Sequence, residues 1–344
     1  MKLLQKKDFT IPPTGISEVA TLAIGGIPQT ILIQAVHPDK PVLLFLHGGP
    51  SMPIPGVNSR SRDYALATAT KELVKHYVVV FWDQRGTGRS YRPDIPPGTM
   101  RISQFVSDAE ELTDYLRERF RQDKIVIAAH SWGTVIGLTL AAKVPHKLHA
   151  YVGISQLINW PENDRLCRDW VMSEAQKRGD RKAVRALEKL GEPPYTESFE
   201  QWGQLRKRLM KYNSMIYKEP GLKAPSLSDA AMIMLRSPDY ELKHIYYSLY
   251  KGFLFSYSQQ MIEDFAKVDF MQQAPRLDVP AYFIHGRKDV HVHGSLVERY
   301  VDALETAGPK ELYWIEKSAH MFRKEDAKEI ERILIERVGA SHTS

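Results

Sequence analysis

Short apolar runs alternate with longer amphipathic segments along most of the chain. Five runs are apolar throughout and rich in β-branched or aromatic residues, which is typical of buried strands in a parallel sheet covered on both faces. These predicted strands are Val42–Leu46, Val78–Trp82, Ile125–Ala129, Tyr151–Ile154 and Ala281–His285. Between them lie segments with apolar residues at helical spacing. The pattern therefore predicts a doubly wound α/β sheet with helices on both faces.

Further elements complete this alternation. Glu18–Ile24 and Gln29–Val36 flank Gly25-Gly26 and are predicted to form a hairpin, while Glu311–Ile315 is predicted as the last strand. The helices predicted to pack on the sheet are Ser103–Phe120, Ser131–Lys143, Ser295–Ala307 and Lys324–Val338.

The alternation of strands and helices stops between residues 157 and 270. This stretch has few β-branched runs, and its predicted helices are Glu162–Lys177, Arg181–Leu190, Phe199–Tyr217, Ser228–Leu235 and Phe255–Phe265. The sheet pattern lies on both sides of the stretch. We therefore expect a helical cap domain, residues 157–270, inserted into a core domain made of residues 1–156 and 271–344, and not two sequential domains.

Composition narrows the class of protein. The 344 residues include one cysteine, Cys167, which excludes an intramolecular disulfide and a zinc site made of several cysteines. No apolar run approaches the ~20 residues of a membrane span, and the first residues lack the apolar core of a secretory signal, so we expect a cytoplasmic protein without membrane contact.

The net charge of +6 raises the question of whether the protein binds nucleic acid. Basic clusters such as Arg206-Lys207-Arg208 lack interleaved aromatic residues and are predicted to be solvated helix surfaces, so no nucleic-acid partner is expected.

Ser131 is the strongest candidate for a chemical role. The predicted strand Ile125–Ala129 leads through His130 to this serine, and a helix is predicted to begin directly after it. A serine on such a sharp strand-to-helix turn needs small neighbours, and the usual pattern is G-x-S-x-G. Here Ala129 replaces the first glycine and Gly133 supplies the second. The alternative is a serine that only caps the helix.

Asp289 and His320 are the predicted partners of Ser131. Asp289 follows the strand Ala281–His285, and His320 follows the strand Glu311–Ile315. Parallel strands bring their carboxyl ends to one edge, where a triad in the chain order Ser, Asp, His is expected. The alternative is a turn-forming aspartate and a loop histidine. In the triad, His320 takes the proton of Ser131, and Asp289 fixes the imidazole tautomer.

A tetrahedral oxyanion at this serine needs preorganised donors. One is predicted to be the backbone N–H of Trp132, the residue after the nucleophile. The second is predicted in His47-Gly48-Gly49-Pro50, which follows another strand; we favour the N–H of Gly49, with Gly48 permitting the turn.

Two weaker patterns are assigned structural roles. Asp83 and Arg85 are predicted to tie loops together near the site, since the G-x-G that follows them lacks the third glycine of a dinucleotide motif. His285, His291 and His293 lie close in sequence, but no carboxylate pair completes a zinc site, so we expect loop histidines and no metal or cofactor.

Three sets of motifs carry a resemblance to a known family. They are HGGP at 47–50, DQRGTGRS at 83–90, and the segments HSWG, HGRKD and SAH around the predicted triad. With them the chain resembles the α/β-hydrolase superfamily, and within it the proline iminopeptidase (prolyl aminopeptidase) group, over about residues 25–156 and 275 to the end. The resemblance implies an α/β-hydrolase fold, mostly parallel with an inserted cap, and a serine exopeptidase that releases N-terminal proline. Relatives with similar motifs include esterases, lactonases and amidases.

The chain departs from the group at the place expected to hold the substrate. Iminopeptidase caps generally carry a tryptophan-rich motif ending in an acid that binds the free amine, and no W-x-x-W-E occurs in 157–270. Glu162 and Glu241 are among the acids that could replace it, although exposed charge is the rule for such residues. Tyr247 and Phe253, in a dense aromatic run, are predicted to give the cavity an apolar wall.

These observations predict a serine hydrolase that cleaves a small ester, lactone or amide through an acyl-enzyme. Release of N-terminal proline is the activity implied by the resemblance, and a carboxylesterase or lactonase with the same triad is the alternative. A non-catalytic ligand-binding protein of this fold fits less well, because a receptor does not need all three triad residues. The expected partner is a small molecule or short peptide, and a homo-oligomer is left open.

Overall fold

The computed structural model describes residue 5 and residues 7–339. Its centre is an eight-stranded sheet in the order β1-β2-β4-β3-β5-β6-β8-β10. The strands are β1 (Ile16–Ile24), β2 (Ile27–Ala35), β3 (Val42–Leu46), β4 (Val78–Asp83), β5 (Ile125–His130), β6 (Leu148–Ile154), β8 (Ala281–Gly286) and β10 (Lys310–Ile315). β2 is antiparallel to β1 and β4, and the remaining pairs are parallel. The predicted fold class, a mostly parallel α/β sheet, is confirmed.

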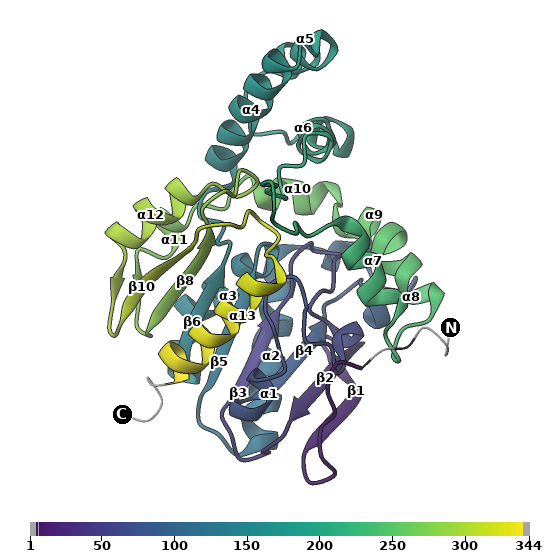
Figure 1. The fold of residues 1–344 in the computed structure, drawn as a ribbon, viewed down its shortest axis with the longest axis vertical. Helices are drawn as coiled ribbons and strands as arrows, with labels where there is room; N and C mark the ends of the chain where they lie inside the picture. The colour runs from purple at the N-terminus through teal and green to yellow at the C-terminus, as the bar shows by residue number, and fades with distance from the viewer. Residues whose placement is uncertain (1–4, 6, 340–344) are drawn as a thin grey trace.

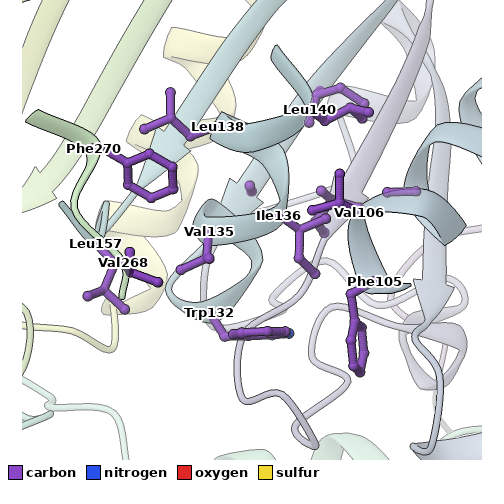
Figure 2. Close-up of a cluster of buried hydrophobic side chains, with 14 of the residues drawn as sticks. Phe105, Val106, Trp132, Val135, Ile136, Leu138, Leu140, Leu157, Val268 and Phe270 are labelled. Carbon is purple, nitrogen blue, oxygen red and sulfur yellow. The ribbon is translucent and has the colours of Figure 1, made fainter. Parts of the chain in front are cut away.

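Both faces of the sheet are covered, because successive residues of its central strands enter different cores. On β3, Leu44 belongs to one buried cluster, whereas Leu43 and Phe45 belong to the other. Helices α2 (Ile102–Phe120), α3 (Trp132–Lys143) and α12 (Gly294–Ala303) supply the first cluster; α1 (Leu73–His76) and α13 (Lys324–Ile333), continued by a π-helical turn (Leu334–Val338), supply the second. Figure 2 shows part of the first cluster around α3.

The segment between β6 and β8 is helical, as predicted. Its helices lie at one end of the sheet, and α4 and α5 project away from the body at the top of Figure 1. They are α4 (Trp160–Lys177), α5 (Arg181–Leu190), α6 (Phe199–Lys211), α7 (Leu227–Leu235), α8 (Leu242–Tyr246), the π-helical turn η6 (Tyr247–Lys251), α9 (Gly252–Ser256), α10 (Gln259–Phe265) and α11 (Phe270–Gln273). Single 3-10 turns elsewhere are Val57–Ser59, Gly88–Ser90, Pro97–Thr99 and Pro145–Lys147.

Several predicted helix ends are wrong for identifiable reasons. The predicted helix Phe255–Phe265 is two helices, because the Ser258 side chain accepts the backbone N–H of Met261 and starts α10 there. The predicted helix Ser295–Ala307 ends at Ala303, and β9 (Glu305–Thr306) then pairs with β7 (Arg276–Leu277). The predicted helix Phe199–Tyr217 ends at Lys211. Among the residues that the structure describes, no helix is long and apolar enough to cross a membrane.

Candidate active site

Ser131 lies on the turn between β5 and α3. Its backbone has φ +53° and ψ −120°. A residue other than glycine adopts this conformation only under strain. The next residue is the first of α3, so the helix begins directly behind the serine. This is the geometry of a nucleophile elbow, which holds a hydroxyl away from the sheet edge.

Small residues make this turn sterically feasible. A Cβ on Gly133 would lie 2.3 Å from the carbonyl oxygen of Leu46, so only glycine lets α3 approach β3 this closely. A Cβ on Gly137 would lie 3.0 Å from the Cβ of Ala129. The absence of a side chain at Gly137 therefore leaves room for Ala129, which explains how the chain tolerates alanine at the first glycine of the motif.

Ser131, His320 and Asp289 form one hydrogen-bonded chain. His320 Nε2 lies 2.8 Å from Ser131 Oγ, and His320 Nδ1 lies 2.8 Å from Asp289 Oδ2. Asp289 follows β8 and His320 follows β10, so three separate strand ends meet at this point. The distances fit a serine whose proton can pass to a histidine that a carboxylate orients.

The environment of Asp289 favours its charged form. Burial by itself raises the pKa of this carboxyl, but the attraction and hydrogen bond of His320, together with His285 and the Val292 N–H, hold the pKa well below its usual range. Asp289 Oδ1 accepts the backbone N–H groups of His291 at 2.8 Å and of Val292 at 2.9 Å. The other oxygen is thereby left to orient His320.

Two more histidines flank His320 and stay neutral. The rings of His130 and His291 have centroids 5.2 and 4.9 Å from that of His320. Burial lowers the pKa of each to about 3, and the nearby His320 contributes to this lowering. His291 Nδ1 is 3.0 Å from the Ser214 hydroxyl. Two neutral imidazoles beside His320 leave it as the histidine that can exchange a proton with Ser131.

The loop carrying Gly49 is fixed against the elbow. Gly49 has φ +124°, which favours glycine, and its carbonyl oxygen accepts the Tyr257 hydroxyl at 2.8 Å. Gln84 joins this loop to the elbow, because its side-chain amide donates to the His47 carbonyl oxygen and accepts the indole N–H of Trp132. As the first residue of α3, Trp132 has a backbone N–H without an acceptor in its own helix.

Asp83 and Arg85 tie loops together near the site, the structural role predicted for them. Asp83 accepts the backbone N–H groups of Val57 and Arg89 and the Tyr240 hydroxyl. Arg85 forms a fully buried ion pair with Asp108, at 2.8 Å. The indole ring of Trp132 faces Phe105 of α2 at a centroid distance of 5.4 Å (Figure 2), so the elbow is also held from the helix side.

A larger cavity of about 310 Å³ lies on one side of Ser131. Its walls are mostly apolar and include four methionines, Met52, Met210, Met215 and Met321. The insertion contributes further lining residues: Trp202, Leu227, Ala230, Phe253 and Tyr257. Its shape and lining suit an apolar group bound next to the hydroxyl.

A smaller, more polar cavity of about 80 Å³ also contacts Ser131. Asp164 of α4 and Arg206 of α6 line it and form a two-point ion pair, with N–O distances of 2.6 and 2.9 Å. Arg206 lies over the Trp202 ring at 4.5 Å and lines the larger cavity too. Burial raises the pKa of Asp164, and the Arg206 charge opposes this. The prediction that Arg206 belongs to a solvated surface is wrong, because the insertion turns it toward the core.

The predicted substrate-binding residues divide into two groups. Gly48 and Phe253 line the larger cavity. Glu162 instead pairs with Arg299, and Glu241 pairs with Lys243 at 2.9 Å with its side chain 68% exposed. The Tyr247 ring packs on Tyr91. Glu162, Glu241 and Tyr247 line neither cavity beside Ser131, so for them the prediction is wrong.

Sequence reasoning missed the polar pair that lines the smaller cavity, Asp164 and Arg206. Trp202 and Arg206 are four residues apart on α6, and Asp164 and Cys167 are three apart on α4, so each pair shares a helix face. The opposite charges of Asp164 and Arg206 were the available signal, but their pairing depends on how α4 packs on α6.

Comparisons with known proteins agree with this fold. The family model described as the alpha/beta hydrolase fold matches residues 41–322. The probable aminopeptidase YbaC of Bacillus subtilis (strain 168) is 29% identical over 309 residues, which cover 89% of this chain and 91% of that protein. A proline iminopeptidase of Heyndrickxia coagulans is 31% identical over 119 residues, 35% of this chain and 36% of that one.

The fold agrees with a solved structure as well. The proline iminopeptidase-related protein from Thermus thermophilus matches with a TM-score of 0.59 and 16% identity, over 95% of this chain and 99% of that one. The resemblance to proline iminopeptidase-like proteins predicted from the motifs is thus confirmed. The chain belongs to the α/β-hydrolase fold family.

Proposed function

We propose that the protein is a serine hydrolase that works through an acyl-enzyme on Ser131. The observation that carries this proposal is the hydrogen-bonded chain from Ser131 Oγ through His320 to Asp289, with both distances 2.8 Å. The strained backbone of Ser131 supports it, since such strain is concentrated at functional turns. A serine that only caps a helix has no need of either feature.

The reaction follows from these positions. His320 Nε2 accepts the proton of Ser131 while Oγ attacks the carbonyl carbon, and Asp289 stabilises the resulting imidazolium. The backbone N–H groups of Gly49 and Trp132 receive the oxyanion. His320 then gives the proton to the leaving oxygen or nitrogen as the bond to carbon breaks. Water then attacks the acyl-enzyme carbonyl while His320 takes its proton. His320 passes this proton to Ser131 Oγ as the bond from carbon to Oγ breaks and the acid is released.

The substrate class is a small ester, lactone or amide with an apolar group next to the carbonyl. The cavity of about 310 Å³ is large enough for a prolyl, aryl or medium-chain acyl group. Release of N-terminal proline is one candidate within this class, supported by the similarity to proteins named probable aminopeptidase and proline iminopeptidase.

A carboxylesterase or lactonase is the second candidate, and one observation favours it. An aminopeptidase holds the free amine of its substrate, for which a carboxylate is the natural partner. Asp164 is the acid that lines the smaller cavity, but both its oxygens already accept hydrogen bonds from Arg206. An ester or lactone substrate has no free amine, so its binding does not require an unpaired carboxylate.

Labelling with a fluorophosphonate tests the serine mechanism. Wild-type protein should be labelled at Ser131, and Ser131→Ala should lose both the label and the hydrolysis of all substrates. Ser155→Ala is the matched control, because Ser155 is also buried, has φ +51° and follows a strand of the sheet, yet lies outside both cavities. No label in folded wild-type protein would overturn the proposal.

A substrate panel then separates the two candidates. A prolyl arylamide is compared with nitrophenyl esters of increasing acyl length and with a lactone. Turnover of the arylamide favours the aminopeptidase. Turnover of the esters or the lactone, with no turnover of the arylamide, excludes the aminopeptidase and favours the esterase or lactonase.

A further inference from the structure

The helical segment 242–256, made of α8, the π-helical turn η6 and α9, has its polarity reversed. Its core-facing positions recur every four residues and carry small or polar side chains: His244, Ser248, Gly252 and Ser256. Its outer positions carry large apolar ones. A surface helix of a globular protein normally shows the opposite arrangement, with the apolar face turned inward.

The inner face explains how the segment is held. A Cβ on Gly252 would lie 2.4 Å from the carbonyl oxygen of Gly86, so the helix backbone touches the loop that follows β4. Before the helix, the Tyr240 hydroxyl donates to the buried Asp83 at 2.7 Å. The segment is therefore held by close backbone contact and by the preceding Tyr240, and the rings of Tyr247 and Phe255 add contacts to Tyr91. The large side chains on its outer face take no part in these contacts.

The outer face is a continuous apolar ridge. Leu242, Tyr246, Tyr250 and Leu254 are 62%, 48%, 53% and 46% exposed, and the rings of Tyr246 and Tyr250 stack at a centroid distance of 5.5 Å. Leu249, 46% exposed, widens the ridge beside them. A monomeric soluble protein rarely exposes a patch of this kind without a partner.

We propose that this ridge is the contact between two copies of the chain, packed antiparallel across a twofold axis near residue 248. The ridge reads Leu, Tyr, Tyr, Leu at a spacing of four, which is the same in both directions. An antiparallel partner therefore sets Leu242 against Leu254 and Tyr246 against Tyr250, twice over. A twofold interface requires such self-complementarity, because each surface must fit its own copy.

Charge agrees with a second copy better than with a lipid surface. Under the same twofold relation, Lys243 faces position 253 and Lys251 faces position 245, both apolar, so no lysine meets a lysine. Helices that bind lipid surfaces carry basic residues along their polar face. Here that face holds His244, Ser248 and Ser256, and it is buried against the protein.

Sedimentation velocity over a range of micromolar concentrations tests the proposal. Wild-type protein should sediment as a dimer, and Tyr250→Glu should weaken the dimer on the order of 100-fold or more, because the charge enters the interface twice. Gln176→Glu, an equal charge change at an exposed position of α4, should leave the dimer intact. Hydrolysis of a short soluble ester should be the same in all three, which shows that Tyr250→Glu is folded.

Cross-linking supplies an independent measurement. Leu249 is the exposed ridge residue beside the proposed axis, and the native Cys167 is buried. Leu249→Cys should therefore form a covalent dimer on oxidation, whereas the wild type should not. The proposal is overturned by a monomeric wild type, by a dimer that survives Tyr250→Glu, or by a dimer in which Leu249→Cys does not cross-link. A monomer that cosediments with phosphatidylcholine vesicles would assign the ridge to lipid instead.

Discussion

The two cavities that meet at Ser131 differ in size and in chemistry. The larger, about 310 Å³, is walled by methionines and aromatic rings, whereas the smaller, about 80 Å³, contains the Asp164–Arg206 pair. Trp202, Arg206 and Tyr257 are among the residues that line both. Ser131 thus lies between an apolar space and a polar one. We propose that a substrate with two unlike sides is held there in one orientation.

The difference arises from the insertion and not from the sheet. The sheet supplies the strand ends that carry the proposed triad, whereas α4 and α6 supply the polar pair and α6, α7 and α9 supply much of the apolar wall. Under the proposed function, chemistry and selectivity are encoded in different parts of the chain, so substitutions should separate them.

The largest effect should come from Asp289, which lines neither cavity but orients His320 toward Ser131, the residue that both cavities share. Asp289→Asn is expected to lower kcat about 10⁴-fold on esters and amides alike, because the amide stabilises the wrong tautomer of His320. Initial rates over a range of substrate concentrations measure this loss. Asp302→Asn, at an exposed position of α12, should leave kcat unchanged. A loss confined to one substrate class would show that Asp289 acts on binding instead.

The next largest effect should be a loss of folding stability when the ion pair of the smaller cavity is broken. Arg206→Leu removes the partner of the buried Asp164 and is expected to lower the free energy of unfolding by about 3–5 kcal/mol, since a buried charge is left unpaired. Urea unfolding measures the change. Lys207→Leu, at the exposed neighbouring position, should stay within about 0.5 kcal/mol of the wild type. Equal effects at both positions would show that the Arg206 pair is an ordinary surface pair.

The core of the sheet was predictable because its strands are buried on both faces. β3 has the predicted bounds Val42–Leu46, and β4, β5 and β8 each extend one residue beyond their predicted ends. Strand ends also carry Ser131, Asp289 and His320, so their proximity follows from topology alone. The hairpin was predictable for a similar reason, since Gly25 and Gly26 both have positive φ.

The insertion was predictable as helical but not as a binding surface. Which face of α6 turns inward depends on its packing against α4, so Arg206 gave the same local pattern as the exposed Lys207. The segment 242–256 was missed as a helix because the positions it buries fully carry small or polar side chains, while many of its large apolar ones are exposed. Glu162 and Glu241 were chosen for their charge, which local sequence cannot distinguish from a surface ion pair.

Low pH should lower the stability of the folded protein through a buried histidine of the larger cavity, His130. His130 lines the larger cavity only, and burial lowers its pKa to about 3. Below pH 6.5 the unfolded chain binds a proton that the folded protein does not, so stability falls as pH falls toward 3, by about 1.4 kcal/mol per pH unit for this residue. His130→Gln should reduce the slope by about that amount in urea unfolding between pH 6 and pH 4, where the unfolded residue is charged and the folded one is neutral. Identical slopes would mean that His130 is protonated in the folded protein.

The smallest effect tests whether the apolar cavity is the acyl site. Each methylene that the cavity buries contributes ~0.8 kcal/mol, so kcat/KM for nitrophenyl esters should rise about fourfold per carbon until the space is filled. Ala230→Phe, which points a ring into the cavity from α7, should end that rise at a shorter chain while sparing the acetyl ester. Ala231→Phe, on the same helix but outside the lining, should keep the wild-type profile. If the Ala230 variant keeps it as well, the acyl group binds on the polar side, and the orientation inferred from the two cavities is reversed.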